Sequence, residues 1–201
     1  MPVIEFATFQ ASEALLANPD LALGALEILK NSQGFLGSWT GYDIDDKKTA
    51  HLVVTWDSLE SHKKMQSGPS YPELAEKLRP TLGGPLTITH VEFDKDHTVA
   101  FDAPVTEILT TKLKDGKTKE ELDAAIVELG AYFNATAKGI RQPQAHGAVL
   151  ETPGTFNTII GWDSLEAYTT TANAEATAPY VAKLFTVVDV KGAKIEFEKR
   201  V

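Results

Sequence analysis

Val53-Val54-Thr55-Trp56-Asp57-Ser58-Leu59-Glu60 returns later in the chain as Ile159-Ile160-Gly161-Trp162-Asp163-Ser164-Leu165-Glu166. The two tryptophans stand at 56 and 162, so the displacement is 106 residues. An apolar pair, one residue and then Trp-Asp-Ser-Leu-Glu is too long a match to arise easily by chance. The stretch therefore indicates an internal duplication, and it decides the number of repeats.

The match extends beyond this stretch. The same displacement aligns Lys77-Leu78 with Lys183-Leu184, and towards the end of each copy it falls by two residues. We predict two repeats, residues 1–98 and 99–201, joined around Asp96-His97-Thr98.

Composition limits the classes of protein that the chain can belong to. It has 201 residues, 43% of them hydrophobic, which suffices for two packed cores of ordinary size. It contains no cysteine, which excludes disulfides and thiolate ligands, and its net charge of −9 disfavours nucleic acid as a partner. No apolar run reaches membrane length and no basic-apolar leader is visible at the start, so we expect a cytoplasmic protein that does not enter a membrane.

Each repeat shows the same succession of expected elements. In the first, a strand at 3–9 is followed by a helix from Asn18 to Gly34, a hairpin of strands 37–44 and 49–56, a helical region to Arg79 and a strand at 86–93. The second repeats this order, and its helix from Lys119 begins with a capping box of Thr118 and Glu121. The pattern β-α-β-β-α-β, given twice, is the ferredoxin-like one, so the expected fold class is α+β.

With these elements in place, the sequence resembles the dimeric α+β barrel superfamily, and within it the antibiotic biosynthesis monooxygenase (ABM) domains. The resemblance lies in Val53 to His62 and in Ile159 to Tyr168, where a strand ends in Trp and passes through a short acidic turn into a helix.

The resemblance implies that the two repeats form an intramolecular dimeric α+β barrel, a pseudo-dimer within one chain, and it leaves a further homodimer open. It also implies a ligand cavity between each sheet and its own helices. The superfamily includes cofactor-free oxygenases, haem-binding and haem-degrading enzymes, polyketide cyclases and stress-response proteins, so the fold alone does not decide the activity.

Candidate chemical groups in the first repeat are two histidines for catalysis and several side chains that could line a pocket. His62 stands where ABM-like domains often have a histidine, whereas the neighbouring Lys63-Lys64 favours a solvent-facing position. For His90, a catalytic base and a hydrogen-bonded sheet histidine remain alternatives. The candidate pocket residues are Trp39, Tyr42, His51, Trp56 and Tyr71, although the position of Trp56 at a strand–helix junction favours a core anchor.

The second repeat changes the identities of these polar residues. His51 is replaced by Asn157, His62 by Tyr168, and His90 by Ala193 or Lys194 depending on the gap, while His146 stands in place of Thr40. A base repeated in both halves would be retained in both, so one site has specialised or neither is catalytic. We expect His146, Asn157, Trp162 and Tyr168 to line the second pocket.

Three functions follow as hypotheses. The first is a cofactor-independent monooxygenase or cyclase that acts on a small aromatic or polyketide-like compound. The second is a non-catalytic or stress-related barrel that binds a hydrophobic ligand, and the third is a haem-binding or haem-degrading protein. We expect no cofactor under the first, and no metal site, because the histidines lack close spacing in the sequence, although distant ligands can converge in a fold.

Overall fold

The computed structural model describes residues 2–200 and divides them into two compact units. The first unit contains the chain up to Glu92 together with the residues from Glu198 on, and the second contains Phe93–Phe197. The last residues belong to the first unit because the Arg200 amide donates a hydrogen bond to the Ser38 carbonyl. The proposed division of the sequence into repeats at residue 98 remains a prediction.

The first unit is built on a four-stranded antiparallel sheet. Its strands lie in the order β4-β1-β3-β2. In the register of this sheet, Glu5 lies opposite Val54 on one side and His90 on the other. The strands are β1 (Val3–Gln10), β2 (Phe35–Asp43), β3 (Thr49–Trp56) and β4 (Thr87–Phe93).

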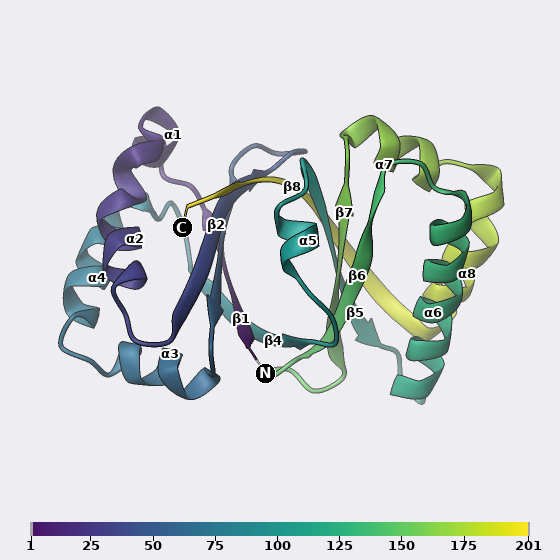
Figure 1. The fold of residues 1–201 in the computed structure, drawn as a ribbon, viewed down its shortest axis with the longest axis horizontal. Coiled ribbons are helices and arrows are strands. Elements are labelled where there is room, and N and C mark those ends of the chain that lie inside the picture. The colour runs from purple at the N-terminus through teal and green to yellow at the C-terminus, as the bar shows by residue number, and fades with distance from the viewer. Residues whose placement is uncertain (1, 201) are drawn as a thin grey trace. The chain divides into compact units, whose positions relative to one another are not determined.

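Short helices cover one face of this sheet (Figure 1). They are α1 (Glu13–Ala17), α2 (Leu23–Lys30), α3 (Leu59–Gln66) and α4 (Tyr71–Leu78), with 3₁₀ turns η1 (Pro19–Ala22) and η2 (Arg79–Thr81). The expected break at Gly68-Pro69 separates α3 from α4. The first helix begins earlier than expected, because Ser12 caps α1 and Asn18 caps only η1.

The second unit repeats this plan with the strand order β6-β7-β5-β8. Helix α6 begins at the predicted capping box of Thr118 and Glu121. The strands are β5 (Val105–Leu113), β6 (Ile140–Val149), β7 (Thr155–Trp162) and β8 (Val188–Lys199). The helices are α5 (Thr98–Phe101), α6 (Lys119–Thr136), α7 (Leu165–Ala172), η3 (Glu175–Thr177) and α8 (Ala178–Val187).

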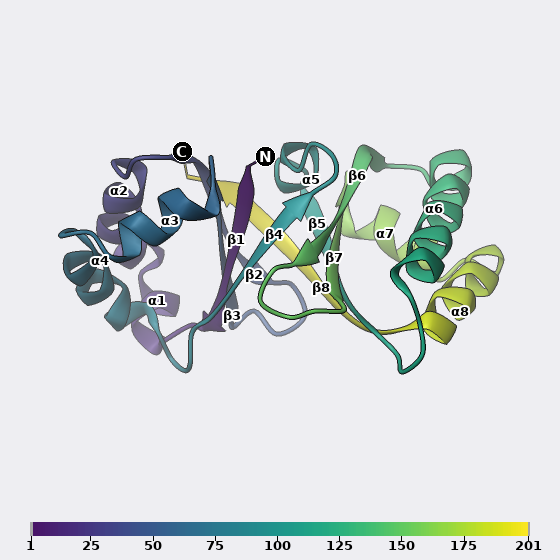
Figure 2. The same ribbon diagram turned by 90° about the horizontal axis from the view of Figure 1, so that it is seen from below.

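Helix α5 has no counterpart in the first unit, and the sequence analysis missed it. It packs on the face of the second sheet opposite to α6 and α8 (Figure 2). The Thr106 hydroxyl donates to the Ala100 carbonyl there, and a Cβ at Gly161 would lie 2.9 Å from the Ala103 Cβ. The close approach of α5 therefore explains why glycine occupies the position that Thr55 has in the first copy of the repeated stretch.

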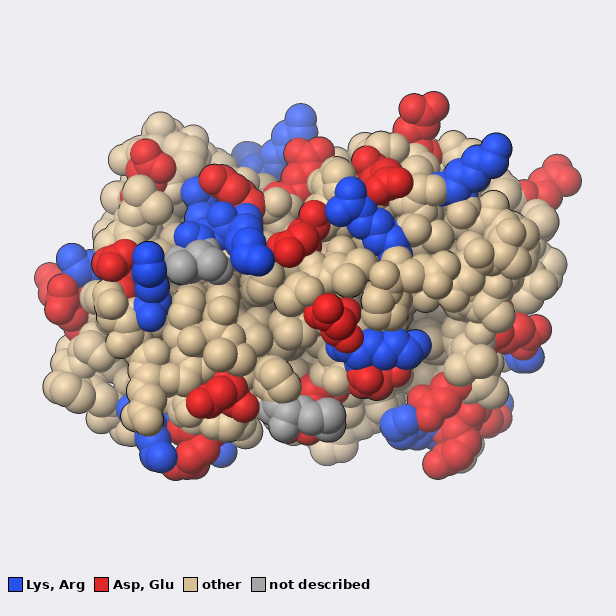
Figure 3. Space-filling view, viewed as in Figure 1, with Lys and Arg blue, Asp and Glu red and all other residues tan. Residues whose placement is uncertain are grey.

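From its first strand on, each unit follows the element order β-α-β-β-α-β. The expected α+β fold of two ferredoxin-like repeats is confirmed. Among the described helices, none combines the length and the apolar character that a membrane span requires. Acidic and basic side chains are interspersed on the face seen in Figure 3.

Candidate functional site

A buried carboxylate lies on the helix-covered face of the first sheet. Residues that are paired directly across neighbouring strands point to the same face of a sheet. Glu5 of β1 therefore shares a face with its partners Val54 and His90. Trp56, at the end of β3, donates a hydrogen bond from Nε1 to Glu5 Oε2 over 2.8 Å. Glu5 is only 6% exposed, so this indole replaces a hydrogen bond that water would otherwise supply.

Two histidines extend this contact into a chain of polar groups. Ser58 caps α3 by accepting a hydrogen bond from the Ser61 amide, and the first turn of that helix places His62 over the Trp56 ring, with centroids 5.1 Å apart. His62 Nε2 lies 3.4 Å from Glu5 Oε2, and His62 Nδ1 lies 2.6 Å from His90 Nε2. The polar groups therefore run from Glu5 through His62 to His90.

One assignment of protons satisfies these contacts. His90 Nε2–H donates to His62 Nδ1, which leaves His62 Nε2–H facing the Glu5 carboxylate at 3.4 Å, and that carboxylate accepts from Trp56. Burial raises the pKa of Glu5 above its ordinary value of 4.5, and the Trp56 hydrogen bond offsets part of that rise. A carboxylate, two imidazoles and an indole in this arrangement can hold a proton and pass it along the chain.

The second repeat has the same framework with different polar groups. Trp162 Nε1 donates to Glu107 Oε2 over 3.1 Å, as Trp56 does to Glu5. Lys194 is opposite Glu107 in the sheet register, so lysine and not Ala193 replaces His90. Tyr168 replaces His62, and the Lys194 ammonium lies 5.5 Å from the centre of its ring. Burial raises the pKa of Glu107 to about 7.

Each unit also has a surface groove beside its helices. The groove of the first unit, about 630 Å³, lies among α2, α3 and α4 and is lined by Ile28, Ser61, Lys64 and Met65, among others. Met65 also belongs to the core cluster that contains Trp56, so the groove borders the core in which that tryptophan lies. The groove of the second unit, about 590 Å³, is lined by residues of α6, α7 and the loop at Lys138-Gly139.

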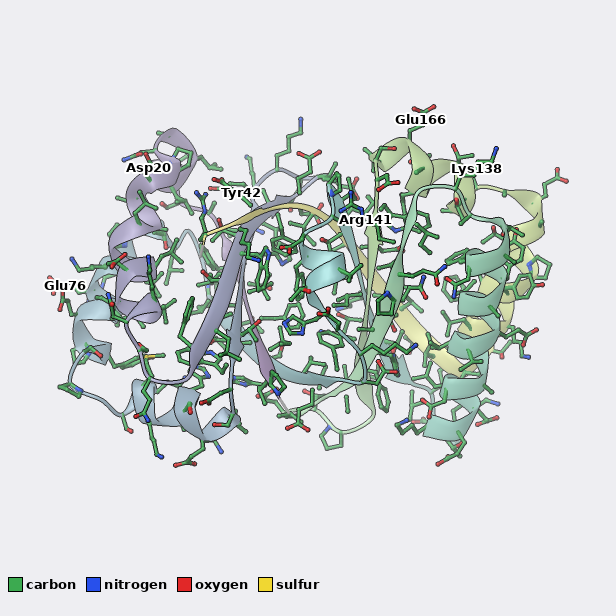
Figure 4. The ribbon with its side chains drawn as sticks, viewed as in Figure 1. Asp20, Tyr42, Glu76, Lys138, Arg141 and Glu166 are labelled. Atoms are coloured by element: carbon green, nitrogen blue, oxygen red, sulfur yellow. The ribbon has the colours of Figure 1, made fainter. Side chains whose placement is uncertain are left out.

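The predicted site residues of the first repeat divide into two groups. His62, His90 and Trp56 come together on the helix-covered face, and the solvent-facing position favoured for His62 is wrong, since it is 1% exposed. Trp39 and His51 point to the other face, as their pairing with Val53 and Gly41 shows. Tyr71 begins α4 with 36% of its surface exposed, and Tyr42 lies on β2 (Figure 4) beside the small apolar cluster of Phe9, Leu15 and Ala50.

His51 lies apart from the polar chain. Thr8 Oγ1 lies 3.3 Å from its Nδ1, Nε2 has no hydrogen-bond partner within the described residues, and burial lowers its pKa.

The predicted residues of the second repeat also lie on both faces. Trp162 and Tyr168 contact each other edge to face, with ring centroids 5.7 Å apart. Asn157 points to the opposite face and accepts a hydrogen bond from Thr110. His146 stacks on Phe156 and lies 2.8 Å from Thr158 Oγ1. The hydrogen-bond partners Thr110 of Asn157 and Thr158 of His146 lie outside the group formed by Glu107, Trp162 and Lys194.

Glu5 and Glu107 were missed by the sequence analysis. A signal for both was present, because Val3-Ile4-Glu5 matches Val105-Thr106-Glu107 at a displacement of 102 residues, and each glutamate interrupts a β-prone strand. The displacement of 106 residues at the tryptophans hid this match, since Glu107 and Trp162 are 55 residues apart whereas Glu5 and Trp56 are 51 apart.

Comparison with solved structures shows what the fold is similar to. A "putative monooxygenase" from Fusobacterium nucleatum superposes with a TM-score of 0.72 at 13% identity, covering 99% of this chain and 94% of the other. A protein of the same description from Lactobacillus acidophilus gives 0.68 at 12% identity, covering 100% and 96%. An anthrone oxidase-like protein gives 0.71 at 15% identity, covering 99% and 92%.

These superpositions cover almost the whole chain, so the expected resemblance holds at the level of a shared fold with these proteins. No family model matches the sequence, and no curated protein matches it.

Proposed function

We propose that this chain is a cofactor-independent monooxygenase of small phenolic or polyketide-like compounds, and that its acid-base centre is the chain Glu5–His62–His90. The observation that carries the proposal is the 2.6 Å contact between His62 Nδ1 and His90 Nε2, which continues to a buried carboxylate. A histidine oriented by a carboxylate is the usual form of a general base. In the proposed roles, His90 accepts the proton, while Glu5 and Trp56 orient His62.

The reaction requires only a base, oxygen and an electron-rich substrate. Removal of a proton from the enol form of a compound such as anthrone gives a carbanion that reduces O₂ and forms a carbon–oxygen bond. One oxygen atom becomes the new carbonyl, and the other leaves as water with the two hydrogens of the former methylene. Atoms and electrons balance with O₂ as the only oxidant.

The groove among α2, α3 and α4 supports a place for the substrate. Its volume lies within the range of small-molecule sites, and its lining residue Met65 belongs to the same core cluster as Trp56. A methionine side chain has three rotatable bonds and adapts its shape readily, so its displacement would bring a flat substrate to the polar chain. We therefore place substrate docking in this groove.

Oxygen uptake tests the proposal. We expect the full chain to consume O₂ with anthrone or simple phenols as probes, and His90→Gln to lower kcat/KM by roughly a hundredfold or more, as loss of a general base does. His146→Gln is the matched control, since that histidine lies outside the polar chain, and it should keep the wild-type rate. Absence of O₂ uptake by the wild type, or equal rates for both variants, contradicts the proposal.

A second candidate function is supported by the packing of the first core. The space between the sheet and helices α2 to α4 holds a continuous apolar cluster that includes Ala25, Leu52 and Leu74, all at least 92% buried. Such packing suits a barrel that binds a hydrophobic ligand in its surface groove without turnover. Saturable binding of anthrone that is weakened by Met65→Ala, with no O₂ uptake, would favour this function.

Haem binding requires a histidine nitrogen that can reach the iron. His62 and His90 hydrogen-bond to each other, so an axial ligand from this pair would have to break that contact. A titration with hemin that gives no Soret shift would eliminate the haem hypothesis.

A further inference from the structure

We infer that Glu5, His62 and His90 form a binding site for one divalent transition-metal ion, such as Zn²⁺ or Co²⁺. The inference goes beyond the proposed function and does not depend on it. It follows from the donor types, their separations and a comparison of the two repeats.

The donor set is that of a transition-metal site. Two imidazoles and one carboxylate are ligands that Zn²⁺ uses in proteins, with three protein ligands leaving one position for water. One donor atom from each of the three residues lies within 4.8 Å of the other two, and all three residues are buried. Burial distinguishes this group from exposed acidic clusters, which are common without an ion.

The separations allow one ion to reach all three residues after a small rearrangement. Two ligands at about 2.0–2.1 Å from a tetrahedral ion lie about 3.4 Å apart, and His62 Nε2 and Glu5 Oε2 are 3.4 Å apart. An imidazole gives an ion only one of its nitrogens, so His62 would bind through Nε2 and give up the 2.6 Å contact of its Nδ1 with His90 Nε2. A movement of His90 towards the same ion would complete the set, since the donor atoms of the three residues already lie within 4.8 Å of one another.

A supporting group outside the ligands is already in place. Trp56 Nε1 donates to Glu5 Oε2 over 2.8 Å and so fixes the carboxylate orientation. The same indole stacks on His62 at an interplanar angle of 12° and fixes the imidazole plane. Neighbours that orient ligands in this way reduce the rearrangement that metal binding requires.

The second repeat explains why a cation belongs at this position. Glu107 is buried like Glu5 and bonded to Trp162 as Glu5 is to Trp56, and Lys194 supplies a positive charge from the neighbouring strand. A buried carboxylate is stabilised by such a partner. In the first repeat the corresponding residue is His90, which is charged only when protonated. A metal ion would give Glu5 a cation that does not depend on protonation.

Metal titration of the full chain tests the inference. After dialysis against a chelator, Co²⁺ is added and the visible absorption of the bound ion is followed, with calorimetry of Zn²⁺ binding in parallel. We expect one ion per chain, and an affinity lowered at least tenfold in Glu5→Gln and in His90→Gln. Glu107→Gln, the corresponding change in the second repeat, should still bind one ion with wild-type affinity.

Glu5→Gln and His90→Gln change the size of the side chain little, so each is expected to fold. Far-UV circular dichroism of each variant checks this. No saturable binding by the wild type, or binding that survives both Glu5→Gln and His90→Gln, overturns the inference. The readout requires no turnover, so a failure to bind metal leaves the oxygenase proposal intact. Conversely, a chain that consumes no O₂ can still bind Co²⁺.

If both proposals hold, Zn²⁺ should inhibit O₂ uptake, because the ion occupies the nitrogens that carry the proton.

Discussion

Glu107 links the pH of the solution to the stability of the fold. Burial raises the pKa of this carboxyl to about 7 from an ordinary value of 4.5, so the folded chain binds its proton more tightly than the unfolded chain. Between these values the folded state holds more protons, and the free energy of unfolding therefore falls as the pH rises. Above about pH 7 the loss from this one group is complete, at about 3 kcal/mol.

Replacement of this carboxyl by an amide should remove the effect. We expect Glu107→Gln to be more stable than the wild type at pH 8 and close to it at pH 5, as measured by urea unfolding across that range. The exposed Glu166, which points away from α7 (Figure 4), gives the control Glu166→Gln with a wild-type pH profile. Buried histidines contribute to the pH dependence of stability in the wild type and in Glu107→Gln alike. The quantity to examine is therefore the difference in free energy of unfolding between these two proteins at each pH. Parallel curves for wild type and Glu107→Gln would show that the carboxyl is not protonated in the fold.

The residue types at the site were only partly predictable. Trp56, His62 and His90 were identified from the sequence because their types suit a pocket. Glu5 was not, since an acidic residue within a strand is usually solvent-exposed, and its burial depends on an indole 51 residues away. The register of β1 against β4, which places Glu5 opposite His90, is a tertiary property that no local pattern encodes.

The passage from β3 into α3 depends on a glycine elsewhere in the sequence. Gly34 has a φ of +85°, its carbonyl accepts a hydrogen bond from the Asp57 amide, and a Cβ there would lie 2.4 Å from the Ser61 Cβ. The second repeat uses Gly139 in the same way, with a φ of +77° and a hydrogen bond from Asp163. These contacts hold the repeated Trp-Asp-Ser segment against the preceding turn in both copies.

Alanine at Gly34 should therefore be costly. The left-handed conformation alone costs about 1–2 kcal/mol for a residue with a Cβ, and the contact with Ser61 adds roughly 1–3 kcal/mol. Gly116 is the matched control, since its φ is +74° and nothing lies within 4 Å of an added Cβ. Urea unfolding should show Gly34→Ala to be less stable than Gly116→Ala by at least about 1 kcal/mol. Equal losses would mean that Ser61 moves aside without cost.

Elements with a strong local signal were predicted closely, and those created by packing were not. Strand 105–113 and the helix from Lys119 agree with β5 and α6, because alternation and the capping box are properties of neighbouring residues. Helix α5 was missed because its four residues carry no periodicity, and its stability comes from contact with β5, β6 and β7. The early start of α1 was missed because Asn18-Pro19 gave the stronger signal for a helix start.

At the scale of the molecule, duplication has preserved a framework and changed the groups it carries. Both repeats retain the buried glutamate, the tryptophan that donates to it and the serine that caps the following helix. What differs is the partner of the glutamate: an imidazole pair in the first repeat, and Lys194 beside Tyr168 in the second. The two sites are therefore one geometry with two chemistries, and each serves as a control for the other.

Conversion of the second site into the first should transfer its binding property. In a double variant, Tyr168→His with Lys194→His, both imidazoles would join Glu107, whose carboxylate Trp162 already orients over 3.1 Å. We expect the number of Co²⁺ ions bound per chain to rise from one to two, measured by the titration described above. The single variant Lys194→His supplies only one imidazole and should stay near one ion. A folded double variant that still binds one ion would mean that equivalent positions in the two repeats do not suffice, because the rings must also approach as closely as His62 and His90 do.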